Sequence, residues 1–117
     1  MSNSVSVKLD WNTNAIGSIE KNAIKGLIAM GFDIASDARR RAPYVTGALV
    51  NTIRAQETSE NVVEVIAGGS YGGKKVDYAW IREQGPNRNP STEHYMENAA
   101  NTIMSGNYMQ KYFGGIA

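Results

Sequence analysis

Three stretches of the chain alternate between apolar and polar residues, a pattern typical of strands that bury one face. They span residues 4–10, 53–58 and 62–68. In the first stretch, one face carries Val5, Val7 and Leu9. In the third, one face carries Val63, Val65 and Ala67, and the other carries Val62, Glu64 and Ile66. A Ser-Glu-Asn turn joins the second stretch to the third, so we expect a small antiparallel sheet.

Residues 14–41 instead repeat apolar side chains every three or four positions, which predicts a long amphipathic helix. Its main stripe consists of Ile16, Ile19, Ala23, Leu27, Met30, Ile34 and Ala38. A flanking stripe consists of Ile24, Ile28, Gly31, Ala35 and Ala42. The helix would be about 40 Å long, and its apolar face is wider than one sheet needs, which suggests contact with another subunit. Gly17, Gly26 and Gly31 indicate either a break or a close approach.

Pro43 ends this helix, because a proline disfavours the helical conformation in the residue before it. Thr46 is then the expected N-cap of a single helical turn over residues 47–51. The glycine-rich segment GGSYGGKK, residues 68–75, is expected to be a mobile loop that can become ordered on a neighbour. The segment VDYAWIREQG fits either a strand or a short helix, and residues 85–90 favour a loop.

Ser91 is the expected N-cap of a last helix, with Glu93 in its first turn. The buried stripe of this helix would consist of Tyr95, Met96, Ala99, Ile103 and Met104. Ser105, Gly106 and Asn107 would end it. The last ten residues concentrate Tyr108, Met109, Tyr112 and Phe113, a composition unsuited to a frayed end. They would pack either on a neighbouring subunit or partner, or on the chain's own sheet.

These elements predict an α+β fold in which a long N-terminal helix and a C-terminal helix pack on a small antiparallel sheet. The 117 residues suit one domain, expected over residues 1–107, with residues 108–117 as a tail that contacts a partner or subunit. The chain has no cysteine, which excludes disulfides and thiolate chemistry. It also lacks an apolar stretch long enough for a membrane helix, and its N-terminus lacks the apolar core of a signal peptide.

Twelve basic residues face eleven acidic ones, a balance that argues against a protein whose main task is to hold phosphates. Three of the basic residues are consecutive: Arg39, Arg40 and Arg41. On a helix they would point in different directions, and Arg41 stands four residues after Asp37, a spacing that favours an ion pair. The run therefore indicates a charge-capped helix end. A contact with an acidic partner surface and a contact with DNA are the alternatives.

Other candidate chemistry has little support in the sequence. Gly68, Gly73 and Lys74 have the spacing of a phosphate-binding loop, but Lys75 replaces the Ser or Thr that would bind magnesium. His94 is the only histidine, so it is expected simply to lie in the first turn of the last helix. The acidic residues Glu83, Glu93 and Glu97 are expected on solvated or interface surfaces. We therefore assign no catalytic, cofactor-binding or metal-binding residue.

Two motifs follow the long helix in a fixed order. The first consists of Ala42-Pro43, Thr46-Gly47, Leu49 and Thr52-Ile53. The second consists of Tyr78-Ala79, Glu83 and Gly85. They resemble the motifs A-P-x-x-T-G-x-L-x-x-S-I and Y-A-x-x-x-E-x-G of the small tail-completion proteins (head-tail joining or minor tail proteins) of long-tailed bacteriophages. A third motif, P-F-L-x-P-A, is altered here to Tyr95-Met96 and Asn98-Ala99. The resemblance covers roughly residues 14–104.

The resemblance implies a structural virion protein without enzymatic activity or cofactor, located in the neck of the tail and assembled in the bacterial cytoplasm. Its copies would form a ring, expected to be hexameric, between the head-tail connector or stopper and the tail terminator or tail tube. The ring would border the DNA channel without binding DNA specifically, and no membrane is involved. The expected interface residues are Arg39, Arg40, Arg41, Tyr71, Lys74, Lys75, Trp80, Tyr108, Met109, Tyr112 and Phe113.

Three alternatives remain open. One is a tail terminator that caps the tail tube. Another is a small nucleic-acid-binding module that uses the arginine run with Lys74 and Lys75. The last is a small hydrolase built around His94.

Overall fold

The computed structural model describes residues 4–10, 21–43, 47–59, 62–71, 74–106 and 108–113. The strands are β1 (Val5–Asp10), β2 (Arg54–Ser59), β3 (Val62–Ala67), β4 (Gly69–Tyr71) and β5 (Lys74–Val76). The helices are α2 (Lys21–Arg41), α3 (Ala48–Thr52), α4 (Ala79–Gln84), α5 (Tyr95–Ile103) and α6 (Tyr108–Phe113), with a 3-10 turn, η1 (Pro90–Thr92), before α5. The fold is α+β, as predicted.

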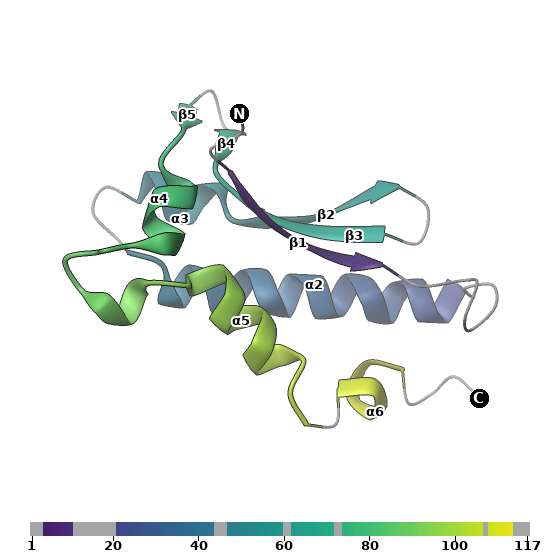
Figure 1. Ribbon diagram of the computed structural model, residues 1–117. Coiled ribbons are helices and arrows are strands. Elements are labelled where there is room, and N and C mark those ends of the chain that lie inside the picture. The colour runs from purple at the N-terminus through teal and green to yellow at the C-terminus, as the bar shows by residue number, and fades with distance from the viewer. Residues whose placement is uncertain are drawn as a thin grey trace.

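The main sheet has the strand order β1-β3-β2 and is antiparallel throughout. In the central strand β3, Val63, Val65 and Ala67 are buried and alternate with half-buried residues, as the sequence pattern predicts. The register places Val7 opposite Val65 and Leu9 opposite Val63. One face of the sheet is therefore a continuous apolar surface, and helix α2 packs against it (Figure 1).

Helix α2 carries the predicted apolar stripe within its described length. Leu27, Met30, Ile34 and Ala38 are buried. Ile24 and Ile28, from the flanking stripe, are half-buried against the same core. The side chains of Ile16, Ile19 and Ala23 lie outside the described residues. Beyond the area that the sheet covers, α2 is packed by α5 and α6 of the same chain (Figure 1). The buried residues of its stripe, from Leu27 to Ala38, therefore need no second subunit to cover them.

Two glycines of α2 mark close approaches and not breaks. A Cβ atom at Gly31 would lie 2.7 Å from Cγ1 of Val63, on the sheet. A Cβ atom at Gly26 would lie 2.9 Å from Cε1 of Phe113 and closer still to the carbonyl oxygen of Tyr112. Glycine is therefore required where β3 and α6 lie against the helix. Gly17 lies outside the described residues.

The segment predicted as a mobile glycine-rich loop forms a short hairpin instead. Strands β4 and β5 pair antiparallel, with Gly69 opposite Val76. Gly68 and Gly69 both adopt positive φ, which lets the chain leave β3 and turn into the hairpin. Val76 is buried and anchors the returning strand to the core. Strands of three residues are too short to show a period in the sequence, so the pattern did not indicate them.

The ambiguous segment that follows is the helix α4. Ala79 and Glu83 lie one turn apart on its inner face and are both buried, a helical spacing that decides the alternative left open by the sequence. The single turn after Pro43 is α3, and its N-cap position is occupied by Gly47 at φ 85. The expected N-cap, Thr46, lies outside the described residues and one position before this cap.

The start of the last helix was predicted wrongly. Ser91 lies in η1 and does not cap α5, which begins at Tyr95 with His94 in the N-cap position at φ 57. Glu93 consequently precedes the helix. Tyr95, Met96 and Ala99 are buried as predicted, whereas Met104 is exposed because the helix ends at Ile103.

Candidate functional site

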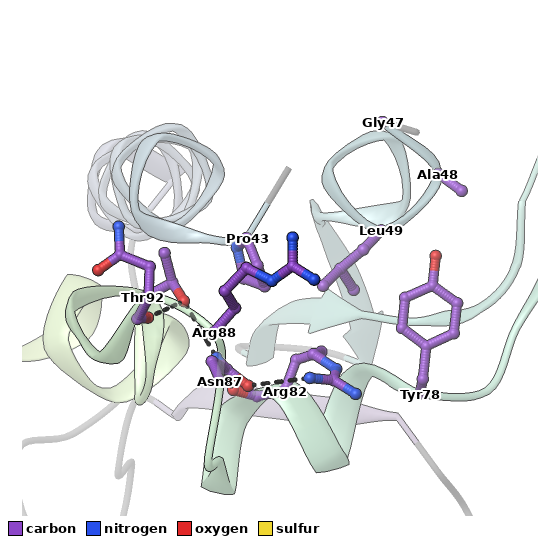
Figure 2. A pocket seen from close by; sticks show the side chains of 10 residues that line it. Pro43, Gly47, Ala48, Leu49, Tyr78, Arg82, Asn87, Arg88 and Thr92 are labelled. Carbon is purple, nitrogen blue, oxygen red and sulfur yellow. Dashed lines mark hydrogen bonds between the residues drawn. The ribbon is translucent and has the colours of Figure 1, made fainter. Parts of the chain in front are cut away.

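The two sequence motifs meet at one groove between α3 and α4, with a volume of about 1000 Å³ (Figure 2). The first motif contributes Pro43, Gly47 and Leu49, and the second contributes Tyr78. The remaining lining residues are Ala48, Arg82, Asn87, Arg88, Asn89 and Thr92. The loop between α4 and α5 therefore closes the side of the groove opposite α3.

Behind the groove, Thr52 ties α3 to the end of β3. It is buried, and its hydroxyl donates a hydrogen bond to the carbonyl of Leu49 at 2.6 Å. The same hydroxyl accepts a hydrogen bond from the backbone N–H of Gly68 at 2.8 Å. A serine hydroxyl could make both bonds, so serine and threonine are chemically equivalent at this position. This position is thus a structural one.

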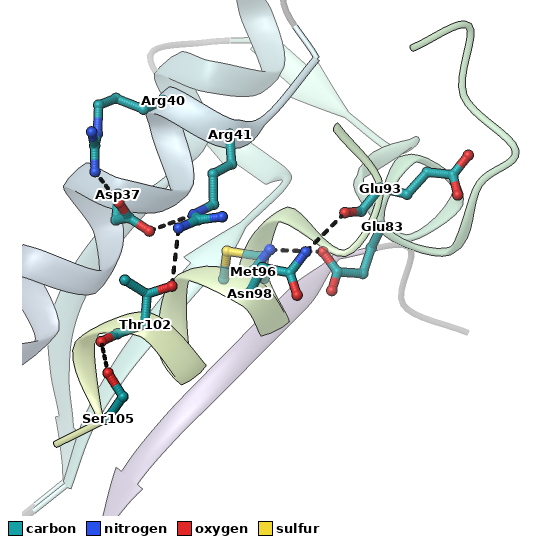
Figure 3. Close-up of polar contacts among 9 residues, drawn as sticks. All are labelled: Asp37, Arg40, Arg41, Glu83, Glu93, Met96, Asn98, Thr102 and Ser105. Atoms are coloured by element: carbon teal, nitrogen blue, oxygen red, sulfur yellow. Dashed lines mark hydrogen bonds and ion pairs between the residues drawn. The ribbon is translucent and has the colours of Figure 1, made fainter. Parts of the chain in front are cut away.

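Glu83 caps the N-terminus of α5 from a distance. Its Oε1 accepts the backbone N–H of Met96 at 2.9 Å (Figure 3), and its Oε2 accepts that of Glu97 at 3.2 Å. The helix dipole stabilises a carboxylate at this end of a helix. Glu83 was predicted to lie on a solvated or interface surface, but it is buried within the fold, where the helix start supplies the hydrogen bonds that water would supply.

Tyr95 makes a second link between α4 and α5. Its side chain is fully buried, and its hydroxyl donates to the carbonyl of Ala79 at 2.8 Å. Burial, and then the neighbouring Glu83 carboxylate, raises the pKa of the Tyr95 hydroxyl well above its usual range. The phenol therefore stays protonated and keeps donating its hydrogen bond at any physiological pH.

Asn87 organises the loop that forms one wall of the groove. Its side-chain amide donates to the carbonyl of Arg82 at 2.8 Å and to the hydroxyl of Thr92 at 3.1 Å. Its backbone N–H donates to Oε2 of Glu93 at 2.8 Å. Asn89 then caps η1 by accepting the backbone N–H of Ser91. The wall is thus held by a closed hydrogen-bond network and is not a loose loop.

The arginine run holds the end of α2 in place instead of forming one basic patch. Arg39 donates twice to the carbonyl of Ile53, at 2.9 and 2.7 Å. Arg40 and Arg41 both pair with the buried Asp37, and the predicted Asp37–Arg41 pair is confirmed at 2.5 Å (Figure 3). Arg41 also donates to the hydroxyl of Thr102 in α5 at 2.9 Å. Arg39 therefore reaches the start of β2, whereas Arg40 and Arg41 share Asp37 on α2 itself and Arg41 also reaches α5.

Within the described part of the aromatic tail, Tyr112 and Phe113 pack on the chain itself, on helix α2 and not on the sheet. Phe113 of α6 is buried against α2. The hydroxyl of Tyr112 donates to Oδ2 of Asp33 at 2.5 Å. Burial and this hydrogen bond raise the pKa of Tyr112 to about 12. The side chains of Tyr108 and Met109 lie outside the described residues.

Of the other expected interface residues, Trp80 and Lys75 are exposed, as a contact surface requires. The side chains of Tyr71 and Lys74 lie outside the described residues. Sequence reasoning missed Arg82, Asn87, Arg88 and Asn89, which line the groove. For Asn87, Arg88 and Asn89 the signal is the polar segment directly after the second motif, and Arg82 lies within that motif at a position that the motif leaves unspecified.

One cluster has the residue types of a metal site. Ligand atoms of Glu83, His94 and Glu97 lie within 4.8 Å of one another, and Nδ1 of His94 lies 3.4 Å from Oε2 of Glu97. Both oxygens of Glu83 already accept backbone N–H groups. The positive end of α5 at this point also disfavours a cation. The arrangement therefore favours helix capping over metal binding.

Comparisons of this chain with protein-family models, with curated proteins and with solved structures find no match. Within the described residues, no helix has the length and apolar character needed to cross a membrane.

Proposed function

We propose that this protein is a structural component of the neck of a long-tailed bacteriophage, a tail-completion protein without catalytic activity. The observation that supports it is the arrangement of the two motifs. Thr52 ties α3 to the end of β3, and Glu83 ties α4 to the start of α5. Pro43, Leu49 and Tyr78 line the groove between α3 and α4. Residues that carry the resemblance thus either hold these helices in place or line the exposed groove.

The chemistry of the buried polar residues also supports a structural role. In the described part of the chain these residues are Asp37, Thr52, Glu83 and Asn87. Each of them is engaged in ion pairs or hydrogen bonds within the fold. Polar groups that perform catalysis must instead reach a substrate. In this proposal the copies form a ring between the head-side connector and the tail.

Cryo-electron microscopy of the chain mixed with its candidate neighbours tests this proposal. The purified full-length chain would be combined with phage head-tail connectors and, separately, with tail tubes. We expect a ring of copies on the connector face or on the tube end. A ring found only at the end of the tube would favour the tail-terminator alternative. A chain that stays monomeric and binds neither assembly at high concentration would refute the proposal.

A further inference from the structure

The groove between α3 and α4 combines an apolar wall with a basic one. Pro43, Ala48 and Leu49 lie along the α2–α3 side, and the ring of Tyr78 closes one end (Figure 2). Arg82 and Arg88 come from α4 and the loop after it. Among the described residues that line the groove, none is an aspartate or a glutamate. Its surface is therefore complementary to a ligand that is partly apolar and negatively charged.

Arg88 is the charge most available to such a ligand. It is exposed, and within the described residues it makes no hydrogen bond or ion pair. Figure 2 shows its guanidinium between Pro43 and Leu49. This position contrasts with that of Arg39, which donates twice to a backbone carbonyl. Five N–H donors at the groove are thus left for an incoming acceptor.

Arg82 adds a second, weakly engaged guanidinium. Its described hydrogen bond to Oδ1 of Asn87 has a length of 3.4 Å, at the long limit for such a bond. The carboxylate of Glu93, in the same loop, accepts the backbone N–H of Asn87, and among the described residues Arg82 has no ion pair with an acid. The two arginines therefore share a groove without a neutralising acid, which favours the binding of an anion.

The groove is also pre-organised. The hydrogen bonds of Asn87 fix the backbone between Arg82 and Thr92, and Asn89 caps η1. A rigid wall loses little conformational entropy when a ligand binds, so more of the interaction energy appears as affinity.

We propose that this groove binds a segment of a partner protein that carries a carboxylate beside an apolar side chain. The carboxylate pairs with Arg88 and Arg82, since a guanidinium matches the planar geometry of a carboxylate. The apolar side chain lies over Leu49 and Tyr78. A peptide fits better than a nucleic acid, because phosphate backbones are bound by extended basic surfaces and this chain has a net charge of only +1.

This inference rests on the proposed function only for the identity of the partner, another protein of the neck. Its chemistry is tested with a short probe. We would titrate the isotope-labelled full-length protein with an acetylated and amidated Gly-Leu-Asp-Leu-Gly peptide and follow the backbone amides by NMR. Shifts are expected for Ala48, Leu49 and Asn89. The same peptide with Asn in place of Asp should bind at least about tenfold more weakly.

Arg88→Gln is the informative variant, because the residue is exposed and holds no other part of the fold. It should weaken binding of the acidic peptide about tenfold, and Arg82→Gln should weaken it less. Lys75→Gln removes an exposed positive charge outside the groove and is the matched control, with affinity expected within about twofold of wild type.

Three results would overturn the inference: equal binding of the acidic and amide peptides, unchanged binding to Arg88→Gln, or tighter binding of a single-stranded oligonucleotide at the same amides. Its failure is distinct from failure of the proposed function. Ring assembly without peptide binding would reject only the proposal that the groove binds an acidic segment. Peptide binding without assembly on connectors or tubes would reject only the neck role.

Discussion

Glu83 lies on α4, yet its carboxylate holds the N-terminus of α5 through the backbone N–H groups of Met96 and Glu97. The residue at the N-cap position itself, His94, makes no side-chain capping bond. The helix start is therefore specified by a residue that is distant in the sequence. This is the physical reason for the glutamate in the second motif.

Replacing Glu83 with alanine should lower the free energy of unfolding by about 2–3 kcal/mol, because one buried and one partly buried N–H group lose a charged acceptor. Glutamine keeps one acceptor oxygen and should cost about half as much. Urea unfolding followed by circular dichroism would measure both. Gln84→Ala, an exposed change on the same helix, is the control and should stay within about 0.5 kcal/mol of wild type. An equally small effect of Glu83→Ala would contradict the capping role.

Tyr112 gives the attachment of α6 a pH dependence. Its pKa is raised from 10.0 to about 12 in the folded protein, so the folded state holds the phenolic proton more tightly than the unfolded state. This contribution to stability is complete below pH 10 and is lost as the pH rises toward about 12. Removing the hydroxyl in Tyr112→Phe should cost about 1 kcal/mol near neutral pH.

Urea unfolding of both proteins at about pH 8 and about pH 11 would measure the effect, and other titrating groups cancel in the difference. The stability gap between wild type and Tyr112→Phe should narrow at the higher pH. A gap that stays constant or widens would show that the bond to Asp33 is not formed in solution.

At the level of elements, the sequence predicts what is periodic and misses what depends on distant residues. Strands β1, β2 and β3 follow the predicted bounds closely, and α2 ends at Arg41 as predicted, because periodic apolar residues set these patterns. The predicted start of that helix, at residue 14, lies outside the described residues. The start of α5 was missed because its cap comes from α4. The groove was missed because Arg82 and Arg88 face α3 only after the loop has folded around Asn87. The two motifs indicated the scaffold, but not the surface that it presents.

The contact between α2 and α6 depends on Gly26. At an unobstructed position in a helix, replacing glycine with alanine stabilises the helix by about 1 kcal/mol. Here its Cβ would clash with the backbone of Tyr112 and the ring of Phe113, which cannot move without moving α6. We expect Gly26→Ala to detach α6 while the sheet stays intact, so hydrogen exchange should rise at least about tenfold for α6 and remain unchanged for β3.

Gly31→Ala is the matched comparison, because its Cβ would meet Cγ1 of Val63 in the core. Overpacking there should destabilise the whole domain, by about 1–3 kcal/mol, and raise exchange in β3 as well. If Gly26→Ala changed exchange throughout the chain in the same way, α6 would be an integral part of the core and not a separately attached element.

The whole molecule is more extended than a typical domain of its length. Its radius of gyration is 15.0 Å, against about 13 Å for a compact chain of this size. The described large apolar residues that remain exposed are Phe32, Trp80, Ile81 and Met104. Trp80 and Ile81 are adjacent on α4, the helix that also carries Arg82 of the groove. Tryptophan and arginine are enriched among the residues that dominate binding energy at interfaces, so α4 is the best candidate for the contact between copies.

A double variant with Trp80→Ser and Ile81→Ser should separate assembly from folding. Both side chains are about half exposed, at 51% and 49%, so the free energy of unfolding should fall by no more than about 1 kcal/mol. Assembly on the connector or tube should weaken at least about tenfold, because the change removes the apolar centre of the expected interface. Phe32→Ser, on α2, removes a side chain that is 57% exposed and provides the matched control. Unimpaired assembly of the α4 variant, together with loss of assembly in Phe32→Ser, would move the contact between copies from α4 to the outer side of α2.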